Sequence, residues 1–280
     1  MTTLTEYRDR EHWSYSSLNG LLNICGLQWA FQRLYGLTPE FRPASMSFGS
    51  AFHRVLEWVA HTRKEGQRPK DSDARELFAD LWRRQLDEDG EVKFDEDEDS
   101  ETCGALGREM VACFTRALDE DERVLCVNQT FCVPLVDAQG NTLTKPLIGE
   151  IDCVVEKIGG VILADWKTSG RRWPKGKADK DLQPTAYLYA ASVDEQFGKC
   201  PISRFDVVVK NKTPVFEQHA TFRVKDHFHR LAELVKLADR MVEHEVFVPN
   251  ETGFYCGGCG FQSACKAWHR NRAKLVSVAA

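Results

Sequence analysis

Apolar residues recur along this chain with two different spacings, and the change comes near residue 120. Before that point they recur every three or four residues, as on one face of a helix. Beyond it, short runs either alternate apolar with polar residues or are wholly apolar, as in half-buried and buried strands. The pattern therefore predicts a helical N-terminal part, a central sheet, and a further helix near the C-terminus.

The helical spacing predicts four helices in the first 120 residues. The first is capped by Ser14 or Ser16 and has an apolar face of Leu18, Leu21, Leu22, Cys25 and Trp29. The other three are expected at residues 47–64, 71–86 and 103–118. The stretch 87–101 has no apolar periodicity and is interpreted as a loop between helices.

The second half of the sequence mixes strands with helices. Strands are expected at residues 124–135, 149–157, 161–168, 205–210 and 215–222, and helices at 181–196 and 225–244. A small sheet flanked by helices is an α+β fold. Residues 1–280 are expected to form one domain with three parts: helical residues 1–120, a sheet core at 121–222 and a C-terminal segment at 223–280.

The charge of the chain is unevenly distributed. Residues 87–101 hold ten acids and one Lys, a net charge of −9. Since the whole chain carries −5, the remainder carries +4. We interpret the acidic stretch as a solvated loop, and the alternatives are mimicry of DNA or gating of a site.

The sequence predicts a cytoplasmic protein. It has no run of about 18 apolar residues, so no membrane span is expected. Its first residues do not place a basic segment before an apolar one, as a secretory signal would. Thiols stay reduced in the cytoplasm, so the ten cysteines are not expected to form disulfides.

The segment from Gly149 to Gly170 reads as a hairpin that carries charged residues. With Gly159 and Gly160 as its two-residue turn, Asp152 faces Lys167 directly and Asp165 lies diagonal to Asp152. These three side chains then share one face. The opposite face is apolar and predicts a core: Ile151, Cys153, Val155, Ile162, Ala164 and Trp166.

Two carboxylates beside a lysine suit a hard divalent cation such as Mg²⁺ or Mn²⁺. Such an ion can polarise a phosphate and lower the pKa of water, and Lys167 can stabilise charge that develops on phosphorus. The alternative is a plain cross-strand salt bridge between Asp152 and Lys167. The hairpin alone leaves both interpretations open.

Three other segments carry candidate chemistry. His53 and Glu57 share a helix face, although such a histidine is more often simply packed. Gln183 and Tyr187 have the same spacing, which an ordinary amphipathic helix also gives. Between the hairpin and that helix lies a basic loop, which suits a phosphate backbone and a stacked base but could equally be solvated. Its candidate DNA-binding residues are Arg171, Arg172, Trp173, Lys175 and Lys177.

Together these segments resemble the RecB-like nucleases of the PD-(D/E)XK superfamily. The resemblance rests on four motifs in order: Gly-x3-His at Gly49 and His53, Gly-x2-Asp at Gly149 and Asp152, Asp-x-Lys at Asp165 and Lys167, and Gln-x3-Tyr at Gln183 and Tyr187. It implies a restriction-endonuclease-like core that forms a single nuclease domain.

The resemblance also implies roles for individual residues. His53, Asp152 and Asp165 would bind Mg²⁺ or Mn²⁺, joined by the backbone carbonyl of Trp166, and Lys167 would serve catalysis. Gln183 and Tyr187 would contribute to the active site and to substrate contacts. Glu57, on the same helix face as His53, is expected to support it from outside the ligand set.

The C-terminal segment carries cysteines at C-x2-C-x5-C spacing: Cys256, Cys259 and Cys265. With Cys25 as a fourth ligand, the set resembles the iron–sulfur branch of the same superfamily, which includes CRISPR-associated spacer-processing nucleases and AddB-type nuclease domains. That resemblance implies a structural [4Fe–4S] cluster. A four-cysteine zinc site and unligated core cysteines are the alternatives. The remaining cysteines are expected to be structural: Cys103, Cys113, Cys126, Cys132, Cys153 and Cys200.

The function that follows is a metal-dependent DNA exonuclease acting on single-stranded ends. The alternatives are a structure-specific or double-strand nuclease of phage or recombination-repair type, and a non-catalytic DNA-binding or assembly module. No G-x4-G-K-[ST] motif is present, so any unwinding would come from a helicase partner. A CRISPR integrase partner and an oligomer are also possible.

Overall fold

The computed structural model describes residues 4–194, 202–253 and 255–278, and it has a mixed α+β fold. A six-stranded sheet lies at the centre of the fold. Its strand order is β1–β5–β6–β7–β8, and β4 also pairs with β5. β4–β5–β6 and β7–β8 are antiparallel, whereas β1–β5 and β6–β7 are parallel. Its strands are β1 (Trp13–Ser14), β4 (Arg123–Val133), β5 (Leu147–Lys157), β6 (Gly160–Ser169), β7 (Ile202–Val209) and β8 (Val215–Thr221).

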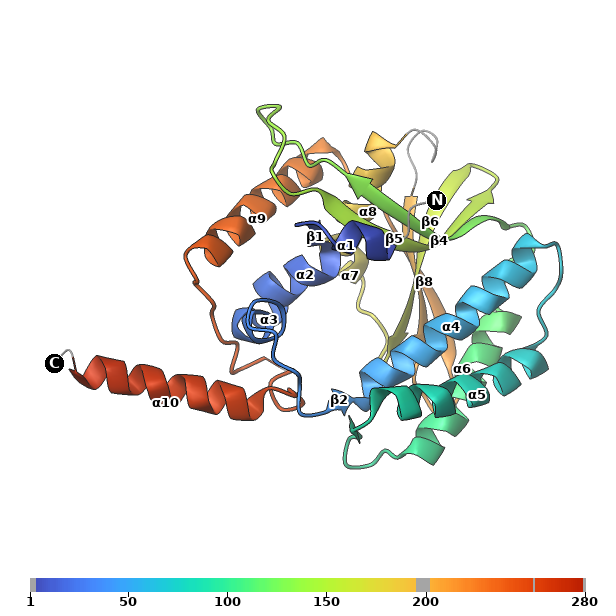
Figure 1. The fold of residues 1–280 in the computed structure, drawn as a ribbon. Helices are drawn as coiled ribbons and strands as arrows, with labels where there is room; N and C mark the ends of the chain where they lie inside the picture. Colours follow the sequence, from blue (N-terminus) through green and yellow to red (C-terminus); the bar gives the residue numbers. More distant parts are fainter. Residues whose placement is uncertain (1–3, 195–201, 254, 279–280) are drawn as a thin grey trace.

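Helices cover both faces of this sheet, each over its own hydrophobic cluster (Figure 1). On one face pack α4 (Ala44–Lys64), α5 (Asp71–Asp89) and α6 (Ser100–Arg116). The other face is covered by α2 (Tyr15–Asn19), α3 (Gly26–Arg33), α8 (Gln183–Val193) and α9 (Lys225–Glu243). The remaining elements are α1 (Leu4–Arg8), the π-helical turn η1 (Gly20–Ile24), α7 (Lys177–Lys180), α10 (Gln262–Val278) and the short strands β2 (Arg42–Pro43) and β3 (Val92–Lys93).

The first predicted helix is interrupted at Cys25. Ser14 does cap α2, since its hydroxyl accepts a hydrogen bond from Ser17 N at 3.3 Å. The π-helical turn η1 then ends at Cys25, whose backbone is extended with φ of −165°. The thiol of Cys25 caps the next helix, α3, by accepting from Gln28 N at 3.5 Å. Cys25 is therefore a junction between two helices, and not a member of one continuous apolar face.

The predicted hairpin register is wrong by two residues. The observed pair Lys157–Gly160 makes Ile158 and Gly159 the turn, and the exposed fraction of Ile158 is 99%. Because side chains alternate with a period of two, a slip of two residues does not by itself move any side chain to the other face. Cys153, Val155, Ala164 and Trp166 are accordingly buried under α4 and α6. Ile151 is buried too, but in the cluster on the other side.

The acidic stretch is only partly a solvated loop. α5 continues to Asp89, and α6 begins after Asp99, which caps it by accepting from Thr102 N at 2.8 Å. Between them, β3 pairs in parallel with β2. Asp89 lies 3.2 Å from Arg42 Nε, so this part of the stretch anchors the segment that leads into α4.

The structure confirms some of the smaller sequence predictions and contradicts others. The helices at 71–86, 103–118 and 225–244 are confirmed within a few residues as α5, α6 and α9, whereas α10 was not expected. Cys103 and Cys153 are buried, as structural cysteines should be, but Cys132 is exposed. Cys200 and the last two residues of the helix predicted at 181–196 lie outside the described residues. Among the residues described, no helix is long and apolar enough to cross a membrane.

Candidate active site

The β5–β6 ladder ends beside the two predicted carboxylates, and we call the region between the separating strands the cleft. The last backbone pair is Cys153–Ala164, and β6 then continues alongside β7 while the first residues of β5 pair with β1. Asp152 and Asp165 are the next residues on the two strands, so they stand at the point where β5 and β6 separate. The structure thus brings the two predicted carboxylates together, although by a different register from the expected one.

Asp152 bridges the separated strands through its side chain. Its Oδ2 accepts a hydrogen bond from the backbone N–H of Trp166 at 2.8 Å. The same oxygen lies 3.7 Å from His53 Nδ1 on α4. Burial raises the pKa of Asp152 to about 6, against the charge of Lys167, which lowers it.

Asp165 is buried and contacts several of the predicted site residues. Its Oδ2 pairs with the ammonium of Lys167, and its Oδ1 accepts from the amide of Gln183. Tyr187 donates to Oδ1 at 3.4 Å, while its hydroxyl accepts from Gln183 Nε2 at 2.7 Å. Burial raises the pKa of Asp165 to about 6. Burial lowers the pKa of Lys167, but Asp165 and Asp152 raise it more, so the ammonium stays charged at neutral pH.

Two residues of the site were missed by the sequence analysis: Tyr15 and Asp181. Asp181 precedes α8 and accepts from Gln183 N at 2.9 Å, which fixes the start of the helix that carries Gln183. Tyr15, at the first position of α2, hydrogen-bonds to Asp181, and burial raises the pKa of its hydroxyl. The sequence gives no spacing signal for either, because the contact joins segments about 165 residues apart.

Gly149 has a packing role next to the site. A Cβ at this position would lie 2.5 Å from Phe131 Cζ, so a side chain here would clash with that ring. The Phe131 ring stands edge-on to Tyr187, with centroids 6.0 Å apart. Because Gly149 has no side chain, the Phe131 ring can lie over β5 at this position. There it packs against Tyr187, whose hydroxyl contacts Asp165.

The donor atoms of the cleft fit a hard divalent cation. Gln183 Oε1 is buried with no hydrogen-bond partner among the described residues, and Asp165 Oδ2 is buried with the Lys167 ammonium beside it. Burial raises the pKa values of both Asp152 and Asp165, and a bound cation would favour their ionised forms. Carboxylate and amide oxygens are ligands that Mg²⁺ and Mn²⁺ prefer. In the described parts of the chain, no three His, Cys, Asp or Glu side chains are already arranged around a metal position.

His53 faces this cleft from α4, and two further carboxylates lie nearby. Its ring stands edge-on to Trp166, with centroids 6.1 Å apart. Burial, followed by the charge of Lys167, lowers the pKa of His53, which favours the neutral imidazole that can bind a metal. Burial and the charge of Glu57 raise the pKa of Glu150. Glu57 thus acts on both His53 and Glu150, and its supporting role stays a prediction.

The family model described as "PD-(D/E)XK nuclease superfamily" matches residues 12–266. This chain belongs to the PD-(D/E)XK nuclease superfamily. The match spans both the helical part and the sheet, and it confirms the expected fold class. No curated protein matches the chain.

One solved structure agrees with the fold of this PD-(D/E)XK protein. It is a crystal structure of a candidate exonuclease from Eubacterium rectale, with 14% sequence identity and a TM-score of 0.55. The match covers 92% of this chain and 93% of that one. Another, SSO0001, has 12% identity and a TM-score of 0.41 over 94% and 92% of the two chains, too low to carry an argument.

In the basic loop of this PD-(D/E)XK protein, Trp173 is packed against neighbouring side chains, whereas the four cations are exposed. The Trp173 ring packs on Phe205 and His219, with centroids 5.0 and 5.4 Å away, and Lys177 Nζ lies 3.8 Å from its centroid. Arg172 pairs with Glu217 at 3.2 Å. Base stacking on Trp173 would have to displace one of these neighbours. Arg171 and Lys175 are exposed.

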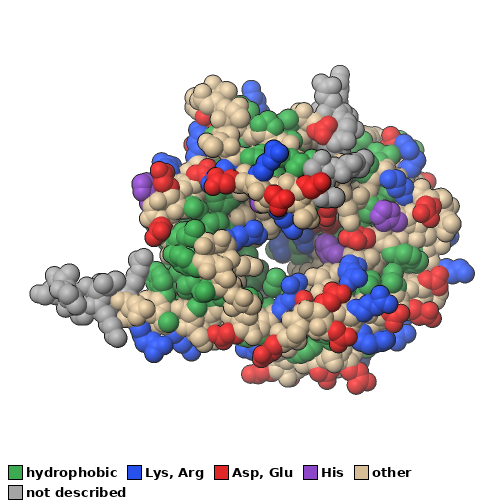
Figure 2. All heavy atoms as spheres, viewed as in Figure 1, with side chains coloured by type: hydrophobic (Ala, Val, Ile, Leu, Met, Phe, Trp, Pro, Cys, Tyr) green, Lys and Arg blue, Asp and Glu red, His purple; other side chains and the backbone are tan. Residues whose placement is uncertain are grey.

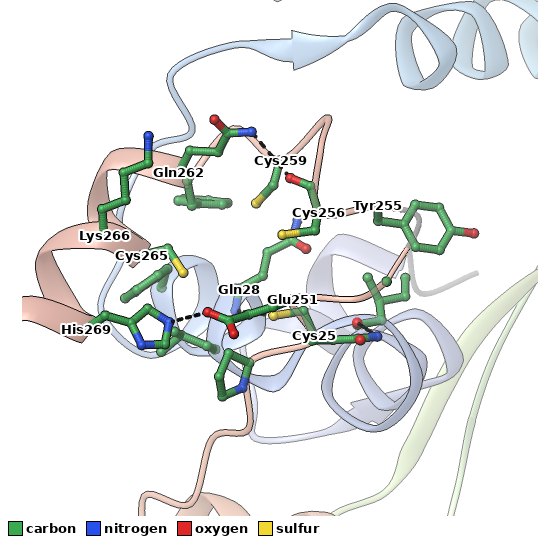
Figure 3. A pocket seen from close by; sticks show the side chains of 17 residues that line it. Cys25, Gln28, Glu251, Tyr255, Cys256, Cys259, Gln262, Cys265, Lys266 and His269 are labelled. Atoms are coloured by element: carbon green, nitrogen blue, oxygen red, sulfur yellow. Dashed lines mark hydrogen bonds and ion pairs between the residues drawn. The ribbon is translucent and has the colours of Figure 1, made fainter. Parts of the chain in front are cut away.

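The four cysteines singled out from the sequence line one cavity of about 250 Å³. Figure 3 shows Cys25 approaching from the start of α3 and Cys256, Cys259 and Cys265 from the C-terminal segment, with their sulfurs turned toward a common space. Burial, and then the neighbouring thiols, raise the pKa values of Cys259 and Cys265. The grouping suits a metal centre with thiolate ligands, because a bound cation would offset the cost of ionising them.

Metal binding at the carboxylates is expected to depend on pH. Burial raises the pKa values of Asp152 and Asp165 from 3.8 to about 6 and so favours their protonated forms. These groups therefore stabilise the metal-free fold below pH 3.8, and this contribution is lost as the pH rises through about 6. A cation needs both carboxylates ionised. Mn²⁺ should therefore raise the melting temperature at about pH 7.5 and have little effect at about pH 5. An equal Mn²⁺ shift at both pH values, or a shift that persists in Asp165→Asn, would contradict this assignment.

Proposed function

We propose that this protein is a metal-dependent DNA exonuclease that acts on single-stranded ends. The observation that carries the proposal is the convergence of Asp152, Asp165 and Lys167 in one cleft of a PD-(D/E)XK fold. Gln183 and Tyr187 complete this arrangement from α8. A simple salt bridge would not need the second carboxylate, the buried amide and the tyrosine.

The residues of the cleft would have different roles in phosphodiester hydrolysis. His53, Asp152 and Asp165, with the Trp166 carbonyl, would hold Mg²⁺ or Mn²⁺, which when bound supplies Lewis acidity toward phosphate and water. Lys167 carries its charge at neutral pH, so its ammonium can orient water or donate to a phosphate oxygen as negative charge develops. Gln183 and Tyr187 fix Asp165 in place, and the exposed cations of the basic loop, Arg171 and Lys175, can hold the approaching backbone.

The shape of the molecule supports a substrate with a free end. Figure 2 shows the surface hollowed at its centre, with basic side chains among those around the hollow. Residues 34–43, which we call the strap, connect α3 to α4 (Figure 1), and in the same view of Figure 2 this part of the molecule lies to one side of the hollow. Glu40 N donates to Gly260 O at 2.8 Å, and Arg42 N donates to Glu91 O at 2.9 Å. These bonds fasten the strap to the C-terminal segment and to the acidic stretch.

A strand that passes beneath a fastened strap must enter by its end. Linear single-stranded DNA should therefore be cleaved with Mn²⁺ or Mg²⁺, and a closed single-stranded circle of the same sequence should not. A gel assay with one label at each end in turn would also give the polarity. Cleavage of the circle at a comparable rate would point instead to an endonuclease. Preference for duplex DNA would favour the double-strand alternative.

We further propose that the four cysteines hold a structural [4Fe–4S] cluster, which would place the chain in the iron–sulfur branch of the superfamily. The support is their common cavity, which joins α3 to a glycine-rich C-terminal segment that buries few side chains. Bound metal would supply folding free energy to this segment. Zinc is the alternative for the same four thiolates.

Anaerobic purification followed by metal analysis separates these alternatives. The cluster predicts a brown protein with iron and acid-labile sulfide in equal amounts and little zinc. Cys259→Ala should lose the metal and lower the melting temperature, whereas Cys132→Ala, at an exposed thiol outside the cavity, should change neither. A colourless protein with one zinc would replace the cluster by a zinc site. Full stability of metal-free Cys259→Ala would refute a structural role.

A further inference from the structure

A second polar cavity lies next to the candidate active site. It has a volume of about 280 Å³ and is lined by residues from α2, η1, the α7–α8 connection and the start of α9. We call it the α2–α9 cavity. None of the residues assigned so far to the metal, to the four cysteines or to the basic loop lines it.

Some charged residues of the cavity are already hydrogen-bonded within the protein, and others are exposed to the cavity. The hydrogen-bond donors of Arg223 are occupied within the protein. Its guanidinium donates to the hydroxyls of Thr185 and Thr221 and to the carbonyls of Phe222, Ala178 and Asp181. The carboxylate of Asp179 accepts from Thr221 at 2.7 Å, and that of Asp181 accepts from Gln183 N and Tyr15. Both carboxylates are thus engaged by internal donors. Lys180 and Arg230 are exposed at the cavity and bring two positive charges to it.

Neutral donors and apolar surface complete the lining. His227 Nδ1 accepts from Val224 N at 3.1 Å, so the proton of a neutral His227 sits on Nε2, which becomes a donor. Asn23 Nδ2 donates to Asn19 Oδ1 at 3.0 Å, which leaves the amide of Asn19 and the carbonyl of Asn23 for other partners. The apolar part of the lining is formed by Leu22, Leu182 and Leu234. Cations, amides and an apolar surface together match the phosphate, base edge and sugar of a nucleotide.

Asp181 forms the wall between this cavity and the candidate active site. It lines the cavity, its backbone carbonyl holds Arg223, and its side chain fixes the start of α8. On the other side it contacts Tyr15, and its charge raises the pKa of Lys167. A strand with one phosphate at Lys167 therefore has the cavity directly beyond Asp181.

We propose that the α2–α9 cavity is a second nucleotide subsite, which binds a nucleotide next to the phosphodiester that is cleaved. Lys180, Arg230 and His227 contact its phosphate, and Asn19 and Asn23 contact its base. The inference rests on the proposed nuclease function, and it gives the single strand a direction across the molecule, from the cleft toward the start of α9.

Binding of short single-stranded oligonucleotides, measured by fluorescence anisotropy in EDTA so that no cleavage occurs, tests the subsite. The variant is Lys180→Ala with Arg230→Ala. Its control is Lys225→Ala with Arg240→Ala, which removes the same charge from exposed positions of α9 outside the cavity. The cavity variant should bind about tenfold more weakly, and its slope of log affinity against log salt should fall by about 0.7 for each phosphate that it no longer neutralises. The control should keep the native slope.

Two further readouts separate a subsite from a general charge effect. Asn23→Ala should change the relative affinities for oligo-dT, oligo-dA and oligo-dC without changing the salt slope. In the cleavage assay the cavity variant should show a raised KM and an unaltered kcat, because its residues do not touch the reacting phosphate. Native affinity and native slope in the cavity variant would overturn the subsite while active native protein keeps the proposed function. Native protein that neither binds nor cleaves any DNA would overturn both.

Discussion

Replacing Lys167 with alanine is expected to lower the rate of DNA cleavage by about 10²- to 10³-fold, the usual effect of removing one group that stabilises transition-state charge. Lys167 is the only ammonium paired with Asp165 in the described part of the chain, and its pKa is raised, so it carries a full charge where phosphate must approach. Single-turnover cleavage of a labelled strand with saturating Mn²⁺ measures the chemical step.

Lys157→Ala is the matched control for Lys167→Ala. Lys157 lies on the same hairpin but at its far end, where it pairs with Asp119 on the surface. This control should cleave at the native rate. Lys167 also lowers the pKa values of Asp152 and Asp165, so its loss should move the onset of Mn²⁺ binding to higher pH. A Lys167→Ala variant that cleaves within a few-fold of the native rate would remove Lys167 from the mechanism.

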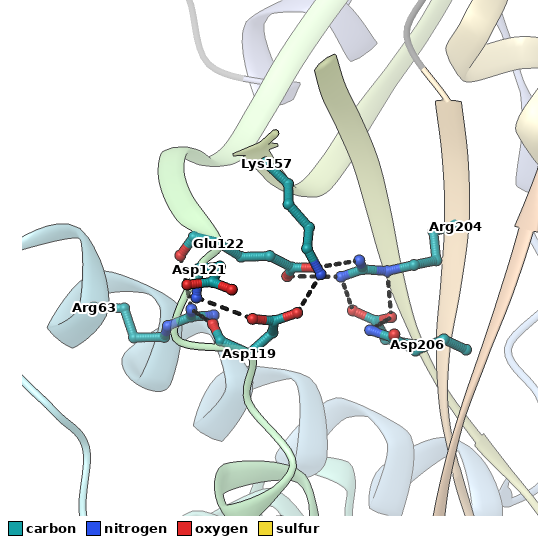
Figure 4. A network of polar contacts seen from close by, with 8 residues as sticks. Arg63, Asp119, Asp121, Glu122, Lys157, Arg204 and Asp206 are labelled. Atoms are coloured by element: carbon teal, nitrogen blue, oxygen red, sulfur yellow. Dashed lines mark hydrogen bonds and ion pairs between the residues drawn. The ribbon is translucent and has the colours of Figure 1, made fainter. Parts of the chain in front are cut away.

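Replacing Arg204 with alanine is expected to destabilise the protein by about 3–5 kcal/mol, because it leaves two buried carboxylates uncompensated. Arg204 on β7 is 7% exposed and donates to Glu122 Oε2 at 3.0 Å and to both carboxylate oxygens of Asp206, at 2.7 and 3.0 Å. Figure 4 shows this arrangement beside the surface pair of Lys157 and Asp119. Urea unfolding followed by circular dichroism gives the change in free energy.

Arg123→Ala provides the comparison for Arg204→Ala. Arg123 pairs with Glu156 at 2.6 Å, but both side chains are exposed, so its loss should cost less than about 1 kcal/mol. Neutralising the whole buried set, with Arg204→Met, Glu122→Gln and Asp206→Asn, should recover part of the stability lost in Arg204→Ala. If Arg204→Ala and Arg123→Ala cost the same, the buried ion pairs are not what holds β7 to the start of β4.

The faces of the hairpin could be predicted from the sequence because they depend only on a period of two. Asp152, Asp165 and Lys167 share a face in any register that differs by an even number of residues. The register itself could not be read, because Gly159-Gly160 and Ile158-Gly159 are both plausible turns. The structure has the second, with Ile158 almost fully exposed. The chemistry of the site survived this error because it rests on the faces.

Other features could not be predicted because they join distant parts of the chain. Tyr15 reaches Asp181, and Arg42 reaches Asp89, across segments that have no shared spacing. The break in the first predicted helix at Cys25 could not be predicted either. The apolar residues on both sides of Cys25 fit one helical pattern, although the Cys25 thiol caps a new helix, α3. Sequence periodicity predicts which face of an element is buried, but it does not predict which other elements that face contacts.

The most direct test of the central claim is a nuclease assay of native protein on end-labelled single-stranded DNA, with Mn²⁺, with Mg²⁺ and with EDTA. The site built from Asp152, Asp165 and Lys167 predicts cleavage with either metal, none in EDTA, and recovery when metal is restored. Cleavage that continues unchanged in EDTA would contradict the metal site. No cleavage by folded, metal-supplemented protein on any DNA would contradict the nuclease and favour a DNA-binding module.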